Sequence, residues 1–449
     1  MYNRRYTPER ITSLSDNEIF VFGSNIEGAH GGGSARVAYN KFGAIWGEGV
    51  GLHGQSYAIP TMHGGLKDIK PYVDEFITFA KRHTELTFLV VRLGCNYAGF
   101  YVYEIAALFK EAINVENIIL PKDFVESIQN PPVVISDEIT WDSADFLSRF
   151  NPLIKSRAED YEKMKGLRCI EYRNTRELVQ QGFYITESGK RIDFADGEEI
   201  LKNTVFYDSE FETDVPTIGA TLVEVINDDC LEVGARLKND GYNPAILNMA
   251  SRTTPGGYVT VGTGGQEETL FRRTDLYRSL CQFVPNAKQY GLPVSEYQYP
   301  LDDNFGGIYT PNATIFRESE TQGYKLMDKY VKISFISVVG LSRPDIDSNG
   351  MIAQHHVNHI KNKMRTILRI GIRHAHDSLV LGALGCGSFC NPPSHIAKLF
   401  HEVFEEPEFK NKYRLISFAI LDDHNAHRAH NPEGNYQPFA EEFAENNEA

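Results

Sequence analysis

The stretch Pro244-Ala-Ile-Leu-Asn-Met-Ala-Ser-Arg-Thr-Thr-Pro-Gly-Gly-Tyr-Val-Thr-Val-Gly-Thr-Gly-Gly-Gln-Glu-Glu268 decides the fold of the C-terminal half of the chain. Its apolar start, residues 245–249, predicts a buried strand, and residues 267–282 predict a helix. The glycines between them allow positive φ angles and a close approach of the backbone to a ligand. Because a helix start offers free N–H donors and a partial positive charge, we expect this loop to face an anion.

Working outward, strands and helices alternate through both halves of the chain. In the N-terminal half the predicted strands are 18–22, 87–93 and 118–120, and the predicted helices are 34–42, 72–83 and 102–113. In the C-terminal half the strands are 221–226, 245–249, 331–339, 379–384 and 415–421, and the helices are 229–238, 267–282, 352–372 and 394–404. This alternation predicts the α/β class, with a mainly parallel central sheet in each half covered on both faces.

A length of 449 residues suggests about two or three domains. The Asn130-Pro-Pro132 break and the charged stretch after it predict a division into three parts. These are a first domain at 1–128, a linker and helical preface at 129–165, and a second domain at 166–449. The tail after His424 is polar, and we expect it to be loose.

The composition excludes several classes of protein. A formal net charge of −15 argues against a protein that tracks along nucleic acid, which needs a Lys/Arg stripe. It leaves room for a phosphate held by backbone N–H groups. No apolar run reaches the roughly 18 residues of a membrane span, and the N-terminus lacks a signal-peptide pattern. Six scattered cysteines without C-x-x-C pairs indicate neither a zinc site nor a disulfide framework, and fit a reducing cytoplasm.

Two further glycine loops accompany the first. Leu381-Gly-Ala-Leu-Gly-Cys-Gly-Ser-Phe-Cys-Asn-Pro-Pro393 follows a predicted strand and precedes a helix, which is typical of a phosphate cradle, although a plain turn is commoner for such a loop alone. The N-terminal half repeats the order, with Asn25 before Gly31-Gly-Gly33, and later Leu93-Gly-Cys-Asn-Tyr-Ala-Gly-Phe100. The repetition favours a ligand role for both loops over coincidence.

Residues 167–443 resemble the bacterial-type poly(ADP-ribose) glycohydrolases, a branch of the macrodomain fold. The motifs that carry the resemblance are Pro244 to Ser251, Pro-Gly-Gly and Gln-Glu-Glu with eight residues between Gly257 and Gln266, Ile308-Tyr-Thr-Pro311 with Phe316-Arg317, Gly385-Cys-Gly-Ser-Phe389 and Phe418-Ala-Ile-Leu-Asp-Asp423. The chain departs from the family at Tyr258, where a third glycine is usual. The resemblance implies hydrolysis of ADP-ribose polymers or ADP-ribosylated macromolecules, with no cofactor and no metal.

The resemblance also implies roles for individual residues. Adjacent Glu267 and Glu268 diverge by roughly 100° on a helix, so they cannot flank one bond symmetrically. We assign acid/base catalysis to Glu268 and orientation of ribose hydroxyls to Glu267, although stabilisation of a helix start by carboxylates is an equally good explanation of the pair alone. Asp229 is expected first as an N-cap, and by similarity as an adenine contact. The ligand-binding residues implied are Asn248, Ser251, Gly256, Gly257, Tyr258, Gln266, Gly385, Cys386, Gly387, Ser388, Phe389 and Asp229.

The N-terminal half looks like a more divergent macrodomain. Hydrolytic macrodomains often place an aspartate two residues after the glycines, where this chain has Ala35, so we expect this half to hold ADP-ribose rather than cut it. Its implied ligand-binding residues are Asn25, Gly31, Gly32, Gly33, Gly94, Cys95, Asn96, Gly99 and Phe100.

Two alternatives to a polymer hydrolase stay open. In the first alternative, both halves only bind ADP-ribose or a related nucleotide. In the second, the protein is a hydrolase of another ADP-ribose adduct: a modified protein, a modified nucleic-acid base, an O-acyl ester or a cyclic nucleotide. His355, His356 and His359 lie at helical spacing, but no carboxylate joins them at ligand spacing in the sequence, so a solvated helix face is favoured over a metal site. For the tail histidines His424, His427 and His430, a flexible polar tail is favoured over an adventitious metal site.

Overall fold

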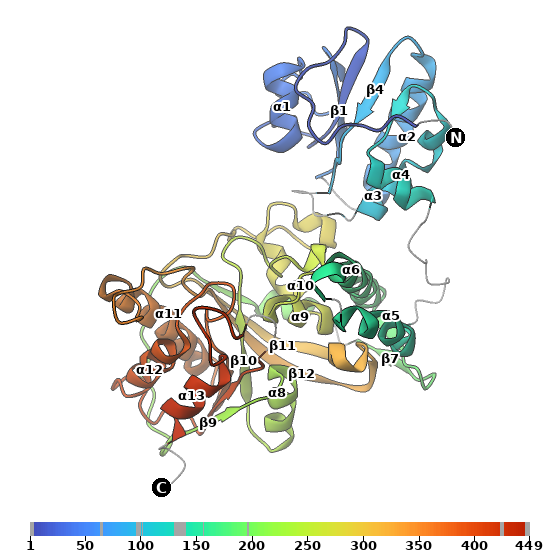
Figure 1. The fold of residues 1–449 in the computed structure, drawn as a ribbon. Coiled ribbons are helices and arrows are strands. Elements are labelled where there is room, and N and C mark those ends of the chain that lie inside the picture. Colours follow the sequence, from blue (N-terminus) through green and yellow to red (C-terminus); the bar gives the residue numbers. More distant parts are fainter. Residues whose placement is uncertain are drawn as a thin grey trace. The chain divides into compact units, whose positions relative to one another are not determined.

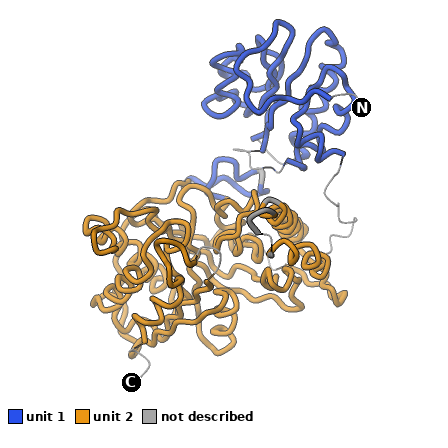
Figure 2. The backbone as a smooth tube through the Cα atoms, viewed as in Figure 1, with its two compact units in different colours: residues 1–138, 282–296 blue, residues 139–281, 297–449 orange. Residues whose placement is uncertain are grey.

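The computed structural model describes residues 4–62, 66–95, 100, 102–129, 141–155, 157–194, 197–422 and 426–444 (Figure 1). The chain divides into two compact units, residues 1–138 with 282–296 and residues 139–281 with 297–449 (Figure 2). The expected site residues Asn96 and Gly99 lie outside the described residues. The expected linker and preface, 129–165, holds helix α5 (Ser143–Lys155) and the start of α6 (Arg157–Gln181), both in the second unit. The domain boundaries at 128 and 165 stay predictions.

The N-terminal unit is built on a five-stranded sheet. Its strand order is β2 (Gly51–His53), β3 (Ser56–Pro60), β1 (Glu18–Ser24), β4 (Thr87–Val90) and β5 (Ile118–Ile119), and every neighbouring pair is parallel except β2 with β3. The helices are α1 (Gly33–Lys41), α2 (Leu66–Arg82), α3 (Val102–Leu108) and α4 (Lys122–Gln129). The sequence analysis missed β2, β3 and α4, which are short or adjoin a proline.

Alternate side chains of β1 bury two faces of this sheet. Phe20 and Phe22 pack in one cluster with Ala35 and Ala38 of α1. Ile19 and Val21 belong to a second cluster, formed with α2 and α3. Since residues two apart on a strand share a face, the strand's hydrophobic run predicted this two-sided burial.

The C-terminal unit has a seven-stranded sheet and a small separate hairpin of β6 (Phe183–Ile185) and β7 (Arg191–Asp193). The strand order is β8 (Val205–Tyr207), β11 (Gly307–Arg317), β12 (Leu326–Val338), β10 (Pro244–Met249), β13 (Ser378–Leu381), β14 (Leu415–Ala419) and β9 (Leu222–Ile226). The five strands from β12 to β9 run parallel, and β11 is antiparallel to both of its neighbours, β12 and β8. The remaining helices are α7 (Gly197–Asn203), α8 (Cys230–Asn239), α9 (Gln266–Arg273), α10 (Tyr277–Leu280), α11 (Gln354–Arg373), α12 (Pro393–Phe404) and α13 (Tyr436–Glu442).

Helices cover both faces of the central strands. Ala245 and Leu247 of β10 share a core cluster with α11 and α12. Ile246, between them, faces α8, where an added Cβ on Gly234 would come within 2.6 Å of its Cδ1. Each unit is therefore a three-layer α/β structure with a mainly parallel sheet, which confirms the predicted fold class.

Two features of the C-terminal unit correct the sequence analysis. The helix expected at 267–282 ends at Arg273, because Thr274 turns to extended backbone and its hydroxyl bonds to Leu270 O at 2.7 Å. The tail is not loose where the structure describes it: α13 packs Phe439 and Phe443 into the core. The sequence signal for this helix is the spacing of Phe439 and Phe443, four residues apart in an otherwise polar segment. Within the described residues, no helix is long and apolar enough to cross a membrane.

Candidate active site

A cavity of about 360 Å³ in the C-terminal unit brings together most of the predicted ligand-binding residues. It lies where β10, β13 and β14 end, and its walls come from the loops that follow those strands. The predicted residues that line it are Asp229, Ser251, Gly257, Tyr258, Gln266, Glu267, Glu268, Gly385, Gly387, Ser388 and Phe389. Asn248, Gly256 and Cys386 stand behind this lining: Asn248 is buried and donates to Ser337 Oγ at 3.0 Å.

Gln266 braces the start of α9 against the end of β10. Its Oε1 accepts a hydrogen bond of 2.9 Å from the N–H of Met249, and its Nε2 donates one of 2.7 Å to Leu247 O. The Gln266 side chain therefore hydrogen-bonds to the main chain at the end of β10. These two bonds hold the start of α9 at the cavity.

Glu267 is buried, and its oxygens are occupied by the loop that precedes the helix. Oε2 accepts from the N–H of Ser251 at 2.7 Å, and Oε1 accepts from the N–H of Gly256 at 3.1 Å. Burial, followed by the nearby charge of Glu268, raises the pKa of Glu267 to about 8, while the N–H donors oppose that shift. These bonds fold the 251–256 turn around the carboxyl group. The role predicted for Glu267 toward ribose hydroxyls stays a prediction.

Glu268 is half-buried and held between two glycines. The N–H of Tyr258 donates to its Oε1 at 3.0 Å. A Cβ added to Gly257 would lie 2.6 Å from Oε1, and one added to Gly265 would lie 2.3 Å from Oε2. Only glycine leaves room for the carboxyl group at both positions, and Gly257 also has a φ of +56°, which glycine adopts without strain.

The second loop, at Gly385–Phe389, is tied down from two directions. Asn391 donates from Nδ2 to Gly385 O at 2.9 Å and to Leu341 O at 2.7 Å. The carbonyl of buried Cys386 accepts a 2.8 Å hydrogen bond from His430 Nε2. Asn391 and His430 were not predicted as site residues. For Asn391, its position directly before Pro392-Pro393 was a signal in the sequence. His430 is far from the loop in the sequence, so no local pattern indicated its contact with Cys386.

Asp229 has the predicted capping role. Its Oδ1 accepts from the N–H groups of Leu231 at 2.9 Å and Glu232 at 3.3 Å, and it pairs with Arg273 at 2.8 Å. The residue also lines the cavity, so a contact with adenine stays possible in geometry and stays a prediction.

The sequence analysis missed two buried arginines beside the loop that precedes α9. Arg272 donates from Nη1 to Thr263 O at 2.9 Å, and Arg168 of α6 pairs with Glu320 at 2.6 Å. A Cβ on Gly264 would lie 2.6 Å from the guanidinium of Arg168. Helix α6 therefore packs directly against the loop that precedes α9, the helix that carries Glu268.

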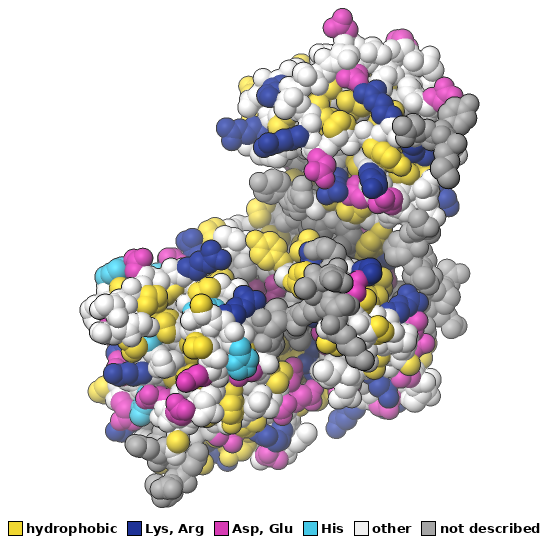
Figure 3. All heavy atoms as spheres, viewed as in Figure 1, with side chains coloured by type: hydrophobic (Ala, Val, Ile, Leu, Met, Phe, Trp, Pro, Cys, Tyr) yellow, Lys and Arg dark blue, Asp and Glu magenta, His cyan; other side chains and the backbone are white. Residues whose placement is uncertain are grey.

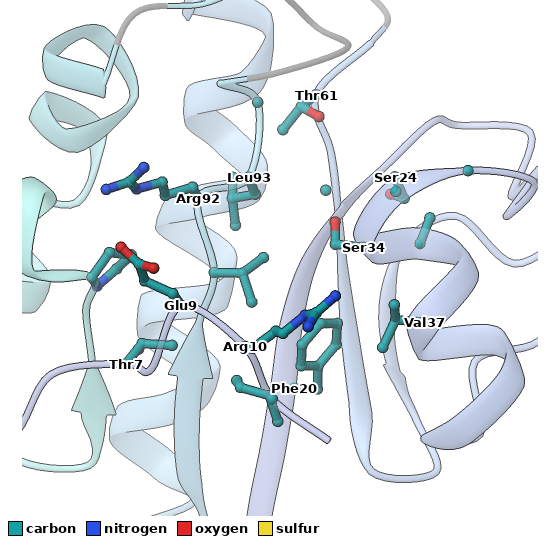
Figure 4. Close-up of a pocket in the computed structure, with 18 of the residues that line it drawn as sticks. Thr7, Glu9, Arg10, Phe20, Ser24, Ser34, Val37, Thr61, Arg92 and Leu93 are labelled. Atoms are coloured by element: carbon teal, nitrogen blue, oxygen red, sulfur yellow. The ribbon is translucent and has the colours of Figure 1, made fainter. Parts of the chain in front are cut away.

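The N-terminal unit has its own cavity, of about 840 Å³ (Figure 4). Four predicted residues line it: Asn25, Gly32, Gly33 and Gly94. Gly31, Cys95 and Phe100 stand outside this lining. Phe100 is part of the hydrophobic core, and burial raises the pKa of the Cys95 thiol to about 12, which disfavours a reactive thiolate.

A carboxylate does join two of the helical histidines, contrary to the sequence analysis. Asp345 Oδ2 lies 3.3 Å from His355 Nε2 and 3.4 Å from His356 Nε2. Asp345 lies in the loop before α11, ten residues before His355 in the sequence. Asp345 and His355 are exposed and His356 is half-buried, and these residues line neither cavity.

Comparison with known proteins agrees with this geometry. Residues 173–318 match the family model of the microbial-type PARG catalytic domain. The structure of poly(ADP-ribose) glycohydrolase (PARG) from Thermomonospora curvata is similar at 25% identity and a TM-score of 0.52, covering 62% of this chain and 99% of that one. The same enzyme bound to the inhibitor ADP-HPD is similar at 25% identity and a TM-score of 0.50, with the same coverage. No curated protein sequence matches this chain.

The matched residues run from within α6 through β11 and include both the Gln266-Glu-Glu268 run and Arg272. The resemblance inferred from the sequence is confirmed by the family model and by the solved structures. Residues 173–318 therefore match the catalytic domain of the microbial-type poly(ADP-ribose) glycohydrolases, and the C-terminal unit is similar in structure to such an enzyme.

Proposed function

We propose that the C-terminal unit removes terminal ADP-ribose units by hydrolysing the ribose–ribose O-glycosidic bond, with Glu268 as the acid/base. The observation that carries this assignment is the placement of Glu268. Its carboxyl group lies on the cavity between Gly257 and Gly265, while the oxygens of Glu267 accept main-chain hydrogen bonds.

In this mechanism the Glu268 carboxyl group gives its proton to the departing oxygen as the C–O bond breaks. The sugar passes through an oxocarbenium-like state. Water then adds to the anomeric carbon, and its proton returns to the Glu268 carboxylate. Glu267 keeps the 251–256 turn in place, and the substrate's own diphosphate supplies negative charge near the developing cation.

Backbone groups rather than basic side chains hold the ligand in this proposal. The N–H groups of Gly385–Phe389 and of Gly256–Gly257 bind the diphosphate, and Phe389 packs against a ribose or the adenine. The visible face of the C-terminal unit carries acidic and basic side chains interspersed (Figure 3). Together with the net charge of −15, this supports capture of one terminal unit rather than tracking along the polymer.

The order in which products appear tests this function. Labelled poly(ADP-ribose) incubated with the protein should yield mono-ADP-ribose from the first time points. Release of long oligomers before the monomer would contradict removal from the end of the chain. Glu268→Gln provides the matched inactive control.

Hydrolysis of another ADP-ribose adduct is the second candidate: Gln266, Glu267 and Glu268 at the cavity favour it over binding alone, and Tyr258 marks where the chain departs from the family. This side chain is 72% exposed where the family usually has glycine. Any leaving group beyond the scissile bond would meet Tyr258 directly, so this residue bears on which adduct is accepted. Rates on ADP-ribosylated protein, ADP-ribosylated nucleic acid and O-acyl esters, compared with the polymer, separate the two candidates.

For the N-terminal unit we propose binding of ADP-ribose without cleavage. Asn25, Gly32, Gly33 and Gly94 line one cavity there, and Ala35 occupies the place where an aspartate would serve hydrolysis. We also propose a cytoplasmic setting, which the six free cysteines support.

A further inference from the structure

Two imidazoles and one carboxylate meet at the start of α11. Asp345 Oδ2 lies 3.3 Å from His355 Nε2 and 3.4 Å from His356 Nε2. One ligand atom of each of the three residues lies within 4.8 Å of the other two, and the two histidine rings have centroids 4.0 Å apart. Within the part of the chain that the structure describes, no other charged side chain pairs with either imidazole.

The separations in this group match a shared metal ion better than direct pairing. A charge-assisted N–H···O hydrogen bond spans roughly 2.7–2.9 Å, so both contacts of Asp345 are long for one. Two ligand atoms that each lie about 2.0–2.1 Å from one tetrahedral Zn²⁺ ion are roughly 3.3–3.4 Å apart. Since His355 is exposed, a small rotation of its ring is enough to bring all three ligand atoms to one ion.

The backbone holds Asp345 opposite the two histidines. Its carbonyl accepts a 2.8 Å hydrogen bond from the N–H of Ala353, the residue before α11. Between these two residues, Ile346 and Ile352 pair as an antiparallel bridge. The 345–353 segment therefore closes on itself next to the helix start, and only side chains need to move when an ion binds.

The donor atoms indicate the class of ion. Two imidazole nitrogens and one carboxylate oxygen suit Zn²⁺ and related transition-metal ions, whereas Mg²⁺ and Ca²⁺ prefer oxygen ligands. Three protein ligands leave the remaining coordination position to water. The partial positive charge of a helix start disfavours a cation, and the negative charge of Asp345 offsets that effect.

We propose that Asp345, His355 and His356 bind one Zn²⁺-type ion that ties the loop before α11 to the helix. The sequence favoured a solvated helix face because no carboxylate stood at ligand spacing, and the loop supplies that carboxylate. The three residues line neither cavity, so the ion takes no part in the proposed hydrolysis. The proposal does not depend on the catalytic role of Glu268.

The same loop also contacts the C-terminal cavity. Two residues before Asp345, the N–H of Arg343 donates a 2.7 Å hydrogen bond to the carbonyl of Phe389, which lines that cavity. An ion that holds Asp345 to α11 therefore restrains the segment on which Phe389 rests. The role of the ion is to steady this part of the structure.

Equilibrium dialysis of the full chain against Zn²⁺, after treatment with a chelator, tests the proposal. About one ion per chain should bind at micromolar free Zn²⁺, and excess Mg²⁺ should not displace it. Asp345→Ala, His355→Gln and His356→Gln should each weaken binding about tenfold or more, because even the loss of a residue that only supports a metal ligand costs roughly 10- to 100-fold. The first two side chains are exposed and the third is half-buried, so the fold should persist.

His359→Gln is the matched control, because His359 lies on the same helix and its Nε2 faces Asp303 instead, at 3.8 Å from Oδ2. This variant should keep the parent's affinity for Zn²⁺. No binding up to high micromolar free Zn²⁺ would overturn the proposal. Binding that survives unchanged in the Asp345, His355 and His356 variants would also overturn it, since the ion would then be held elsewhere, for example by histidines of the tail.

Hydrogen exchange read out by mass spectrometry locates the ion independently. Zn²⁺ should slow exchange in peptides covering 343–358 of the parent and should not do so in Asp345→Ala. Protection confined to other peptides would contradict the proposed site.

Discussion

The main-chain N–H of Tyr258 donates a 3.0 Å hydrogen bond to Oε1 of Glu268. The residue that departs from the family's usual glycine therefore still makes this contact, since every residue type except proline carries that N–H. The tyrosine side chain is 72% exposed, so it alters the entrance to the cavity rather than the surroundings of the carboxyl group. In the proposed function, this relationship separates the acid/base role of Glu268 from the contacts that the Tyr258 side chain makes with the substrate.

Glu268→Gln should lower kcat by about a hundredfold or more, which is the scale of a lost general acid. The amide keeps the size of the side chain, and Glu268 is only half-buried, so the fold should persist. Single-turnover hydrolysis of labelled polymer measures the effect, and calorimetry with ADP-ribose checks that binding survives. A variant as active as the parent would remove Glu268 from the catalytic role.

Gly257→Ala should reduce activity nearly as much as Glu268→Gln. Its Cβ would lie 2.6 Å from Glu268 Oε1, so the carboxyl group must move. Gly241→Ala is the matched control: Gly241 has a φ of +85° and nothing within 4 Å of its added Cβ. Both variants should lose about 1–2 kcal/mol of stability from left-handed backbone, and only the first should lose activity. Equal activity of the two variants would contradict the role given to the close approach.

Tyr258→Ala should raise KM for the polymer about three- to tenfold and leave kcat nearly unchanged, as expected for loss of one aromatic contact beyond the scissile bond. Tyr258→Phe, which keeps the ring, should behave like the parent. Initial rates over a range of polymer concentrations give both parameters. A large fall in kcat for the alanine variant would mean that the side chain acts on the reacting atoms.

Glu267→Gln should flatten the dependence of stability on pH. Because burial raises the pKa of Glu267 to about 8, the folded state binds more protons than the unfolded state between about pH 4.5 and 8. The free energy of unfolding therefore falls as pH rises through that window, by at most about 1.4 kcal/mol per unit for one group. Urea unfolding at several pH values should show a shallower slope for this variant. Glu199→Gln, at an exposed position on α7, should keep the parent's slope.

Phe439→Ala should cost about 3–5 kcal/mol of stability, since Phe439 is fully buried in the main core of the C-terminal unit. Gln437→Ala, at an exposed position on the same helix, should cost little. Thermal unfolding compares the two variants. A similar small loss for both would indicate that the C-terminal helix is not part of the cooperative unit.

The sequence by itself determined the alternation of strands and helices, the three-layer α/β class, and the loops that face the cavities. These follow from local patterns: apolar runs predicted β1 and β10, and glycines before helix starts predicted the turns after them. The tertiary structure decided how Gln266 and Glu267 are held, because their side chains accept hydrogen bonds from the N–H groups of Met249 and Ser251 across the loop. It also decided that His430 supports the second loop and that Asp345 lies beside His355 and His356. Such contacts join residues far apart in the chain, and no short-range periodicity encodes them.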